Sequence, residues 1–115
     1  MRKFLLVAAL LFSGCAALGI APWQMELARN NANIAKLEIG ISADSTYAIM
    51  GKPRLREAYS EKDGGVLDVW FYYTNRVWAD GSNTKDEMTP VLFRNKQLIG
   101  YGQDYYTQNI KLIHE

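Results

Sequence analysis

The sequence predicts an α+β fold in which two N-terminal helices precede an antiparallel β-meander of three or four strands. Three observations support this prediction: apolar residues recur at helical spacing early in the mature chain, apolar and aromatic residues form strand-like runs later, and short turn signals separate those runs. The chain has 115 residues, which is enough for one domain with one modest core.

The first 14 residues have the three-part layout of an export signal. Arg2 and Lys3 are positively charged, residues 4–12 are nine consecutive apolar residues, and Ser13 and Gly14 are small. The apolar run is too short to span a bilayer as a helix, because a spanning helix needs about 20 residues.

The segment Phe12-Ser13-Gly14-Cys15 resembles a lipobox, the processing site of bacterial lipoproteins. In those proteins the signal is cut before the cysteine, whose sulfur carries diacylglycerol, and the new amino end is acylated. The resemblance implies that the signal is cut between Gly14 and Cys15 and that acyl chains hold the protein on a membrane, at about 0.8 kcal/mol per buried CH₂. By analogy with enterobacterial lipoproteins, Ala16 after the cysteine favours the outer membrane. The alternative is an ordinary secretory signal with a chance cysteine.

The predicted organisation is a signal peptide at residues 1–14, a lipidated cysteine and short tether at residues 15–22, and one α+β domain at residues 23–115. The tether from Ala16 to Pro22 reaches about 25 Å when fully extended. We therefore expect the folded domain to stay close to the membrane surface.

Two helices are predicted before the strands. The first covers residues 23–37, where apolar residues have mostly helical spacing and three asparagines, at 30, 31 and 33, weaken the pattern. The second begins after Ser42, a suitable N-cap, and ends at Gly51, since Pro53 blocks its continuation.

Four strands are predicted after the helices. Asp63-Gly64 and Asn95-Lys96 supply turn signals for successive hairpins. The predicted strands cover residues 55–60, 66–74, 89–94 and 97–101. The tail at residues 103–115 is predicted to be either a short helix or an extended segment, and residues 76–88 form a long loop of the kind that is often functional.

Several short motifs between residues 34 and 102 resemble one family. The motifs are Leu37-Glu38-Ile39-Gly40-Ile41-Ser42, Ile49-Met50-Gly51-Lys52-Pro53, Val69-Trp70-Phe71-Tyr72-Tyr73 and Leu92-Phe93-Arg94-Asn95-Lys96-Gln97-Leu98. They are similar to the SmpA/OmlA family of small outer-membrane lipoproteins, which includes a small lipoprotein component of the β-barrel assembly machinery. Residues 85–90 with Gly100-Tyr101-Gly102 are closer still to an uncharacterised proteobacterial lipoprotein family of that architecture.

The resemblance implies a two-layer sandwich, with two helices packed on one face of the sheet. It also implies a role in envelope or outer-membrane protein assembly. The loop at residues 76–88 departs from the pattern of the assembly-machinery lipoprotein.

Composition excludes several functional classes. The chain has one cysteine and one histidine, His114, whereas most zinc sites need several such ligands. A formal charge of +1 gives no basic excess for nucleic acid. Catalysis by a nucleophile needs an adjacent base, and none is evident. We therefore predict no catalytic residue, no metal and no cofactor.

The acidic pairs Glu57/Glu61 and Asp86/Glu87 lie in polar segments. Paired carboxylates do acid–base chemistry only where burial separates their pKa values. We expect these four to be a solvated, charged surface.

Strand alternation divides residues 66–74 into two faces. Leu67, Val69, Phe71 and Tyr73 are predicted to lie under the helices, and Asp68, Trp70, Tyr72 and Thr74 on the opposite face. Trp70 and Tyr72 are then either exposed for a partner or covered by the long loop or the tail with Tyr105 and Tyr106. The predicted interaction surface comprises Asp68, Trp70, Tyr72, Arg76 and Trp78.

The preferred functional hypothesis is a non-enzymatic, lipid-anchored protein-interaction module at the periplasmic face of the outer membrane. Its partners would be the membrane, through the acyl chains, and a protein of the cell envelope. The alternative is a module that binds a small ligand or lipid in an apolar pocket between helices and sheet. The oligomeric state and the identity of the partner stay open.

Overall fold

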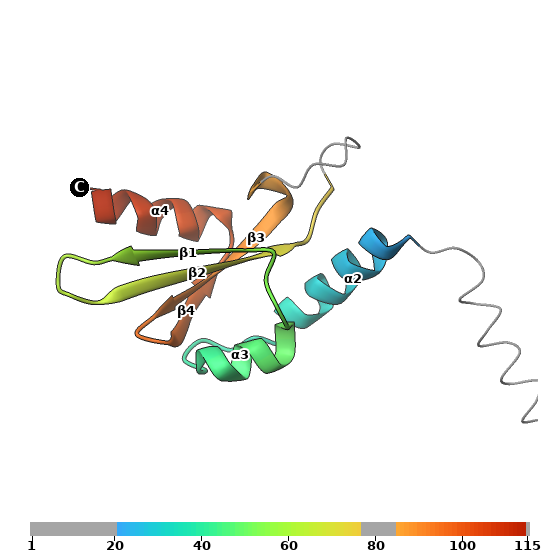
Figure 1. Ribbon diagram of the computed structural model, residues 1–115, viewed down its shortest axis with the longest axis horizontal. Coiled ribbons are helices and arrows are strands. Elements are labelled where there is room, and N and C mark those ends of the chain that lie inside the picture. Colours follow the sequence, from blue (N-terminus) through green and yellow to red (C-terminus); the bar gives the residue numbers. More distant parts are fainter. Residues whose placement is uncertain (1–20, 77–84, 115) are drawn as a thin grey trace, which may run out of the picture.

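The computed structural model describes residues 21–76 and 85–114, and the ribbon in Figure 1 shows an α+β domain, which confirms the predicted class. The cleavage site, Cys15 and Trp78 lie outside the described residues. The elements are α2 (Pro22–Ile34), α3 (Ala43–Met50), β1 (Leu55–Ser60), β2 (Val66–Tyr73), the 3₁₀ turn η1 (Lys85–Glu87), β3 (Met88–Arg94), β4 (Gln97–Tyr101) and α4 (Gln103–His114).

The four strands form one antiparallel sheet in the order β1-β2-β3-β4, as the predicted meander requires. The β3–β4 turn is made by Asn95 and Lys96, whose φ angles are 51° and 66°. Two successive positive φ angles are typical of the tight hairpin turn whose twist matches that of the flanking strands. The turn therefore places Lys96 at the corner where β3 and β4 meet.

Helix α3 covers one face of the sheet, and the last residue of α2, Ile34, joins the margin of the core on that face (Figure 1). The core there consists of Leu37, Met50, Trp70, Tyr72, Val91, Phe93 and Leu98, with Ile34, Ile41, Ala43 and Ile49 at its margin. The prediction that the opposite face of β2 packs under these helices is wrong. The alternation itself is correct, but the face that carries Trp70 and Tyr72 is the one that the N-terminal helices bury.

Helix α4 covers the other face, so the ambiguous tail is helical (Figure 1). This second core consists of Leu67, Val69, Phe71, Met88 and Leu92, with Tyr59, Ile99, Tyr105, Tyr106, Ile110 and Ile113 around it. Gly100 lets α4 approach closely, because a Cβ added there would lie 2.5 Å from Cε2 of Tyr105. The predicted pair of helices on one face is thus joined by a third helix on the opposite face.

Polar contacts hold α2 on the end of β2. Asn30 is 3% exposed, and its Nδ2 donates to the carbonyl oxygen of Tyr73 at 2.9 Å. Asn31 donates to the carbonyl oxygen of Thr74 at 2.9 Å. Two of the asparagines that weaken the helical pattern therefore attach the helix to the sheet, and α2 ends at Ile34 rather than at residue 37.

Candidate functional site

A surface groove of about 440 Å³ lies where the start of α3, strands β1 and β2, and the β3–β4 turn meet. We call it the α3 groove, and its lining residues are Ala43, Asp44, Tyr47, Arg56, Asp68, Trp70 and Lys96. A second hollow of about 350 Å³ shares Asp68 and Lys96 with it and adds Val66 and Asn95. Together the two hollows extend along the turn.

Backbone hydrogen bonds fix the walls of the α3 groove. The amide of Ala43, the first residue of α3, donates to the carbonyl oxygen of Lys96 at 2.8 Å. Leu98 exchanges further backbone bonds with the segment before α3, donating to Ile41 and accepting from Gly40, both at 2.8 Å. Ser42 caps α3 by accepting from the amide of Ser45 at 3.0 Å. The helix start and the hairpin turn are therefore joined directly.

Trp70 forms the inner side of the groove. It is 6% exposed, yet its indole Nε1 is buried without a hydrogen-bond partner in the described part of the chain. Its ring contacts Phe93 at a centroid distance of 4.4 Å and Tyr47, edge to face, at 6.1 Å. A buried donor that lacks an acceptor costs about 1–3 kcal/mol, so this N–H requires an explanation.

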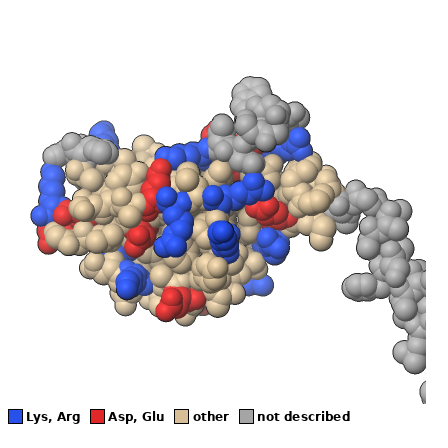
Figure 2. Space-filling model, in the orientation of Figure 1, with Lys and Arg blue, Asp and Glu red and all other residues tan. Residues whose placement is uncertain are grey.

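The charged side chains of the groove are not paired with one another. Within residues 21–76 and 85–114, the side chains of Asp44, Asp68 and Lys96 make no ion pair or hydrogen bond. The guanidinium of Arg56 makes no ion pair there either and lies over the ring of Trp70, 5.1 Å from its centroid. Figure 2 shows basic and acidic side chains interspersed on the face that it displays. The groove thus combines two cations, two anions and a buried donor.

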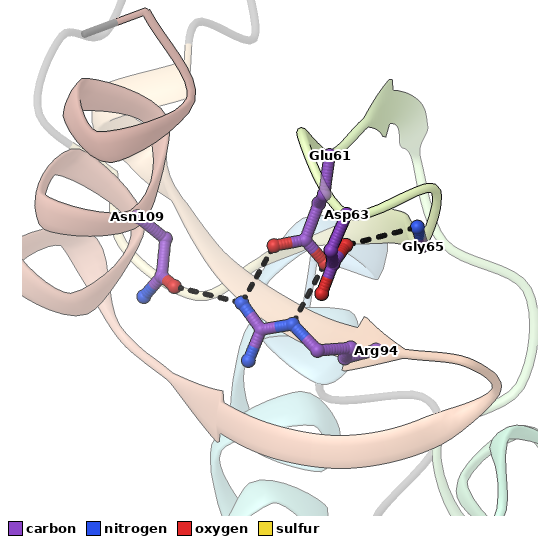
Figure 3. Close-up of polar contacts among 5 residues, drawn as sticks. All are labelled: Glu61, Asp63, Gly65, Arg94 and Asn109. Atoms are coloured by element: carbon purple, nitrogen blue, oxygen red, sulfur yellow. Dashed lines mark hydrogen bonds and ion pairs between the residues drawn. The ribbon is translucent and has the colours of Figure 1, made fainter.

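A second polar cluster joins the β1–β2 turn to β3 and α4 (Figure 3). Arg94 donates from Nε to Glu61 Oε1 at 2.7 Å and from Nη2 to Oε2 at 3.0 Å, and Nη2 also reaches Asn109 Oδ1 at 3.5 Å. The hydrogen bond to Glu61 raises the pKa of Arg94. Because this guanidinium already has its acceptors, the cluster serves to connect elements.

Glu57 is the centre of a third cluster, on the α4 side of β1. Its carboxylate accepts from the hydroxyls of Tyr59 and Tyr106, both at 2.7 Å, and pairs with Lys85. Burial acts to raise the pKa of Glu57, but the hydrogen bonds from Lys85 and the two tyrosines outweigh it, so the pKa is lowered. This carboxylate connects β1, η1 and α4.

The four acidic residues that the sequence groups into two pairs do not share one environment. Glu57 and Glu61 each bind a different cation. Asp86 is exposed, but Glu87 is 1% exposed and the side chains of Glu57 and Glu61 are 19% and 15% exposed. The expectation that all four are solvated is therefore wrong for these three. The turn η1 packs the Glu87 side chain inward beside β3.

The predicted interaction surface is divided by the structure. Trp70 and Tyr72 lie on one face of β2, but α2 and α3 bury them to 6% and 1% exposure, so they do not form an open patch. The hydroxyl of Tyr72 donates to the carbonyl oxygen of Gly51 at 2.8 Å, and burial raises its pKa. Arg76 stacks on the ring of Trp23, 4.2 Å from the centroid, beyond the other end of β2. Among the described residues of the predicted surface, Asp68 and Trp70 are the two that line the α3 groove.

Sequence reasoning missed five residues of the groove: Ala43, Asp44, Tyr47, Arg56 and Lys96. The first three share α3, and Arg56 and Lys96 come from two other segments, so no local motif joins all five. The one available signal was the Asn95-Lys96 turn, because a lysine at the second position of such a turn must adopt a positive φ.

Comparison with known proteins places the chain in a family. A family model described as "Protein of unknown function (DUF3192)" matches residues 9–108. No curated protein and no solved structure shows a significant match. Among the described residues, no helix has the length and apolar character needed to cross a membrane, and no group of three His, Cys, Asp or Glu side chains is arranged to hold a metal ion.

Proposed function

We propose that this chain, which belongs to the DUF3192 family, is a lipid-anchored envelope protein that acts as a non-enzymatic protein-interaction module. Acyl chains on Cys15 would hold it at the periplasmic face of the outer membrane. A part in envelope or outer-membrane protein assembly is what the resemblance to the SmpA/OmlA family implies. The observation that carries the proposal is the α3 groove, which presents unpaired charges and a buried donor at an open surface.

The residues of the groove favour binding over catalysis. Its lining contains Trp, Tyr and Arg, the residue types that dominate the binding energy of protein interfaces. It contains no Ser, Cys or His, so the Ser–His and Cys–His pairs that activate a nucleophile are absent from it. A partner side chain inserted at this point would gain both ring contacts and charge-assisted hydrogen bonds.

The proposed anchor would keep the groove near the membrane. Six residues, 16–21, separate Cys15 from the start of α2, and their full extension is about 20 Å. The contacts of Asn30 and Asn31 with the end of β2 fix α2 relative to the sheet. The partner is therefore expected to be a membrane-bound protein or one that works at the membrane surface.

The anchor is tested by replacing Cys15 with Ser. We expect labelled palmitate to be incorporated into the wild type and not into the variant, and the variant to leave the outer-membrane fraction. Equal fractionation of the two forms, with no fatty acid on either, would reject the anchor.

The binding surface is tested by photo-crosslinking in intact cells. A photoreactive amino acid at Tyr47, in the groove, is compared with one at Lys111, which is exposed on α4 on the far side of the sheet. We expect a discrete crosslinked protein from position 47 alone. Identical crosslinks from both positions, or none from position 47, would reject the groove as the contact surface.

The alternative, a module for a small ligand or lipid, is supported by the volume of the groove, since ligand pockets are typically about 300–1,000 Å³. It predicts a small molecule that remains bound through purification from membranes. Native mass spectrometry of the purified wild type distinguishes the two functions. A ligand-binding module would show the mass of the lipidated chain plus the ligand, and an interaction module that of the lipidated chain alone.

A further inference from the structure

We infer that the α3 groove binds a carboxylate side chain, Glu or Asp, of a partner polypeptide, which accepts a hydrogen bond from Trp70 Nε1 and pairs with Arg56 and Lys96. The inference rests on the proposed function and specifies the chemistry of the partner. It follows from three independent features of the groove: the buried donor, the two cations, and the two anions that flank them.

The first feature is the indole N–H of Trp70. An indole nitrogen can only donate, so the group that satisfies it must be an acceptor. The surface neighbours of the ring are Tyr47, which is 49% exposed, and the exposed side chain of Arg56. Trp70 also lines the α3 groove, so an acceptor that enters the groove meets the residue whose N–H lacks a partner.

The second feature is the pair of cations. Arg56 lies over the indole ring, and its guanidinium has no carboxylate partner in the described part of the chain. Lys96 adopts φ 66°, a conformation that strains a residue with a side chain. Glycine would be easier to accommodate at this turn position, so the strain is consistent with a use for the ammonium group beside the groove.

The third feature is the pair of anions, Asp44 and Asp68, which line the same groove without partners among residues 21–76 and 85–114. They would repel a compact, multiply charged anion such as phosphate. They favour a ligand that carries N–H donors beside its carboxylate, and a polypeptide backbone carries such donors at every residue except proline. This balance of charge selects an acidic side chain on a peptide.

The test is a titration followed by NMR. The full chain, labelled with ¹⁵N and kept in a non-ionic detergent, gives an indole N–H signal for each tryptophan, and Trp70→Phe identifies the signal of Trp70 by removing it. The probes are a blocked Gly-Glu-Gly tripeptide, the matching Gly-Gln-Gly tripeptide and inorganic phosphate. We expect the Trp70 signal to move to saturation with the Glu peptide and to move at least fivefold less with the other two.

Variants separate binding from folding. Arg56→Gln and Lys96→Gln should each weaken binding of the Glu peptide about threefold to tenfold. Asp68→Asn should let inorganic phosphate move the Trp70 signal further, because a charge that repels phosphate is lost. Lys96→Gly should weaken binding while raising the melting temperature, since glycine relieves the positive φ. Lys111→Gln, on the far side of the sheet, is the control and should change neither the binding of the Glu peptide nor the melting temperature.

The inference is overturned if the Glu and Gln peptides shift the Trp70 signal equally, if phosphate saturates it at lower concentration, or if Asp68→Asn leaves the response to phosphate unchanged. Any of these results can occur while position 47 still crosslinks to a protein. In that case the proposed function stands and only the chemistry assigned to the partner is rejected.

Discussion

Replacing Asn30 with Ala tests whether polar contacts hold α2 on the sheet. Asn30 is 3% exposed and donates to the carbonyl oxygen of Tyr73, a residue 43 positions away in the sequence. The substitution removes that donor, so the buried carbonyl oxygen of Tyr73 loses this hydrogen bond. The matched control is Asn33→Ala in the same helix, because among the described residues the Asn33 side chain hydrogen-bonds only to Lys36, at an exposed position.

The expected magnitude follows from these two environments. Loss of a buried hydrogen-bond partner costs about 1–3 kcal/mol. Both substitutions also gain about 0.5 kcal/mol from the higher helix propensity of Ala, and this gain cancels in the comparison. A destabilisation of about 2 kcal/mol lowers the melting temperature of a domain this size by roughly 8–16 °C. Asn30→Ala should therefore melt well below Asn33→Ala, which should equal or slightly exceed the wild type.

The assay is thermal unfolding followed by far-ultraviolet circular dichroism, with urea unfolding as a second measure of the free energy. Melting temperatures of the two variants that agree within about 2 °C would refute the reasoning, because the buried bond would then contribute nothing beyond helix propensity.

Three further experiments address the polar clusters and the packing of α4. The fold lowers the pKa of Glu57 from its ordinary value near 4.5, so the ionised carboxylate stabilises the native state at pH values above that, and this stability is lost as the pH falls through the folded-state pKa. Glu57→Gln should therefore lower the free energy of unfolding, measured in urea, at pH 7 and have little effect at pH 3. Gly100→Ala should cost about 1–3 kcal/mol in urea unfolding, since the new methyl group collides with the ring of Tyr105; an unchanged midpoint would contradict the close contact. A double-mutant cycle with Arg94→Met and Glu61→Gln should give a coupling of at most about 1 kcal/mol that shrinks in 1 M salt, and a larger, salt-independent value would contradict a partly exposed pair.

The boundaries of the short elements could be predicted from local chemistry. The strands predicted at residues 55–60 and 97–101 are β1 and β4, because turn residues flank each of them closely. Ser42 and Gly51 bound α3 as predicted, since the cap side chain and the positive φ are local requirements. Elements whose ends depend on neighbouring residues in the sequence are therefore predicted well.

The packing of the sheet could not be predicted in the same way. Alternation along β2 separates two sets of side chains, but both sets are largely apolar, as Phe71 on one face and Tyr72 on the other illustrate. Periodicity therefore does not determine which helices cover which face. That choice depends on contacts between distant segments, such as the bond from Asn30 to the end of β2.

The candidate site was only partly predictable for a related reason. Asp68 and Trp70 share a face of one strand, which is why the sequence points to them, and both do line the groove. Their partners Arg56 and Lys96 come from β1 and the β3–β4 turn, and only the register of the strands brings them together. A pattern within one segment cannot reveal a site that four segments build jointly.

The hydrogen bonds between α2 and the end of β2 have a mechanical consequence. If the chain is fastened at Cys15, any tension between the fastening point and a bound partner enters the domain through α2. It then reaches the sheet through Asn30, Asn31 and the bidentate pair of Glu26 with Arg54, whose N–O distances are 2.7 and 2.8 Å. Such bonds lose their strength over a small displacement, whereas the two cores on either side of the sheet yield gradually. Under a pulling force the first event would therefore be the release of α2, which would lengthen the link to the bilayer while leaving the sheet and its groove intact.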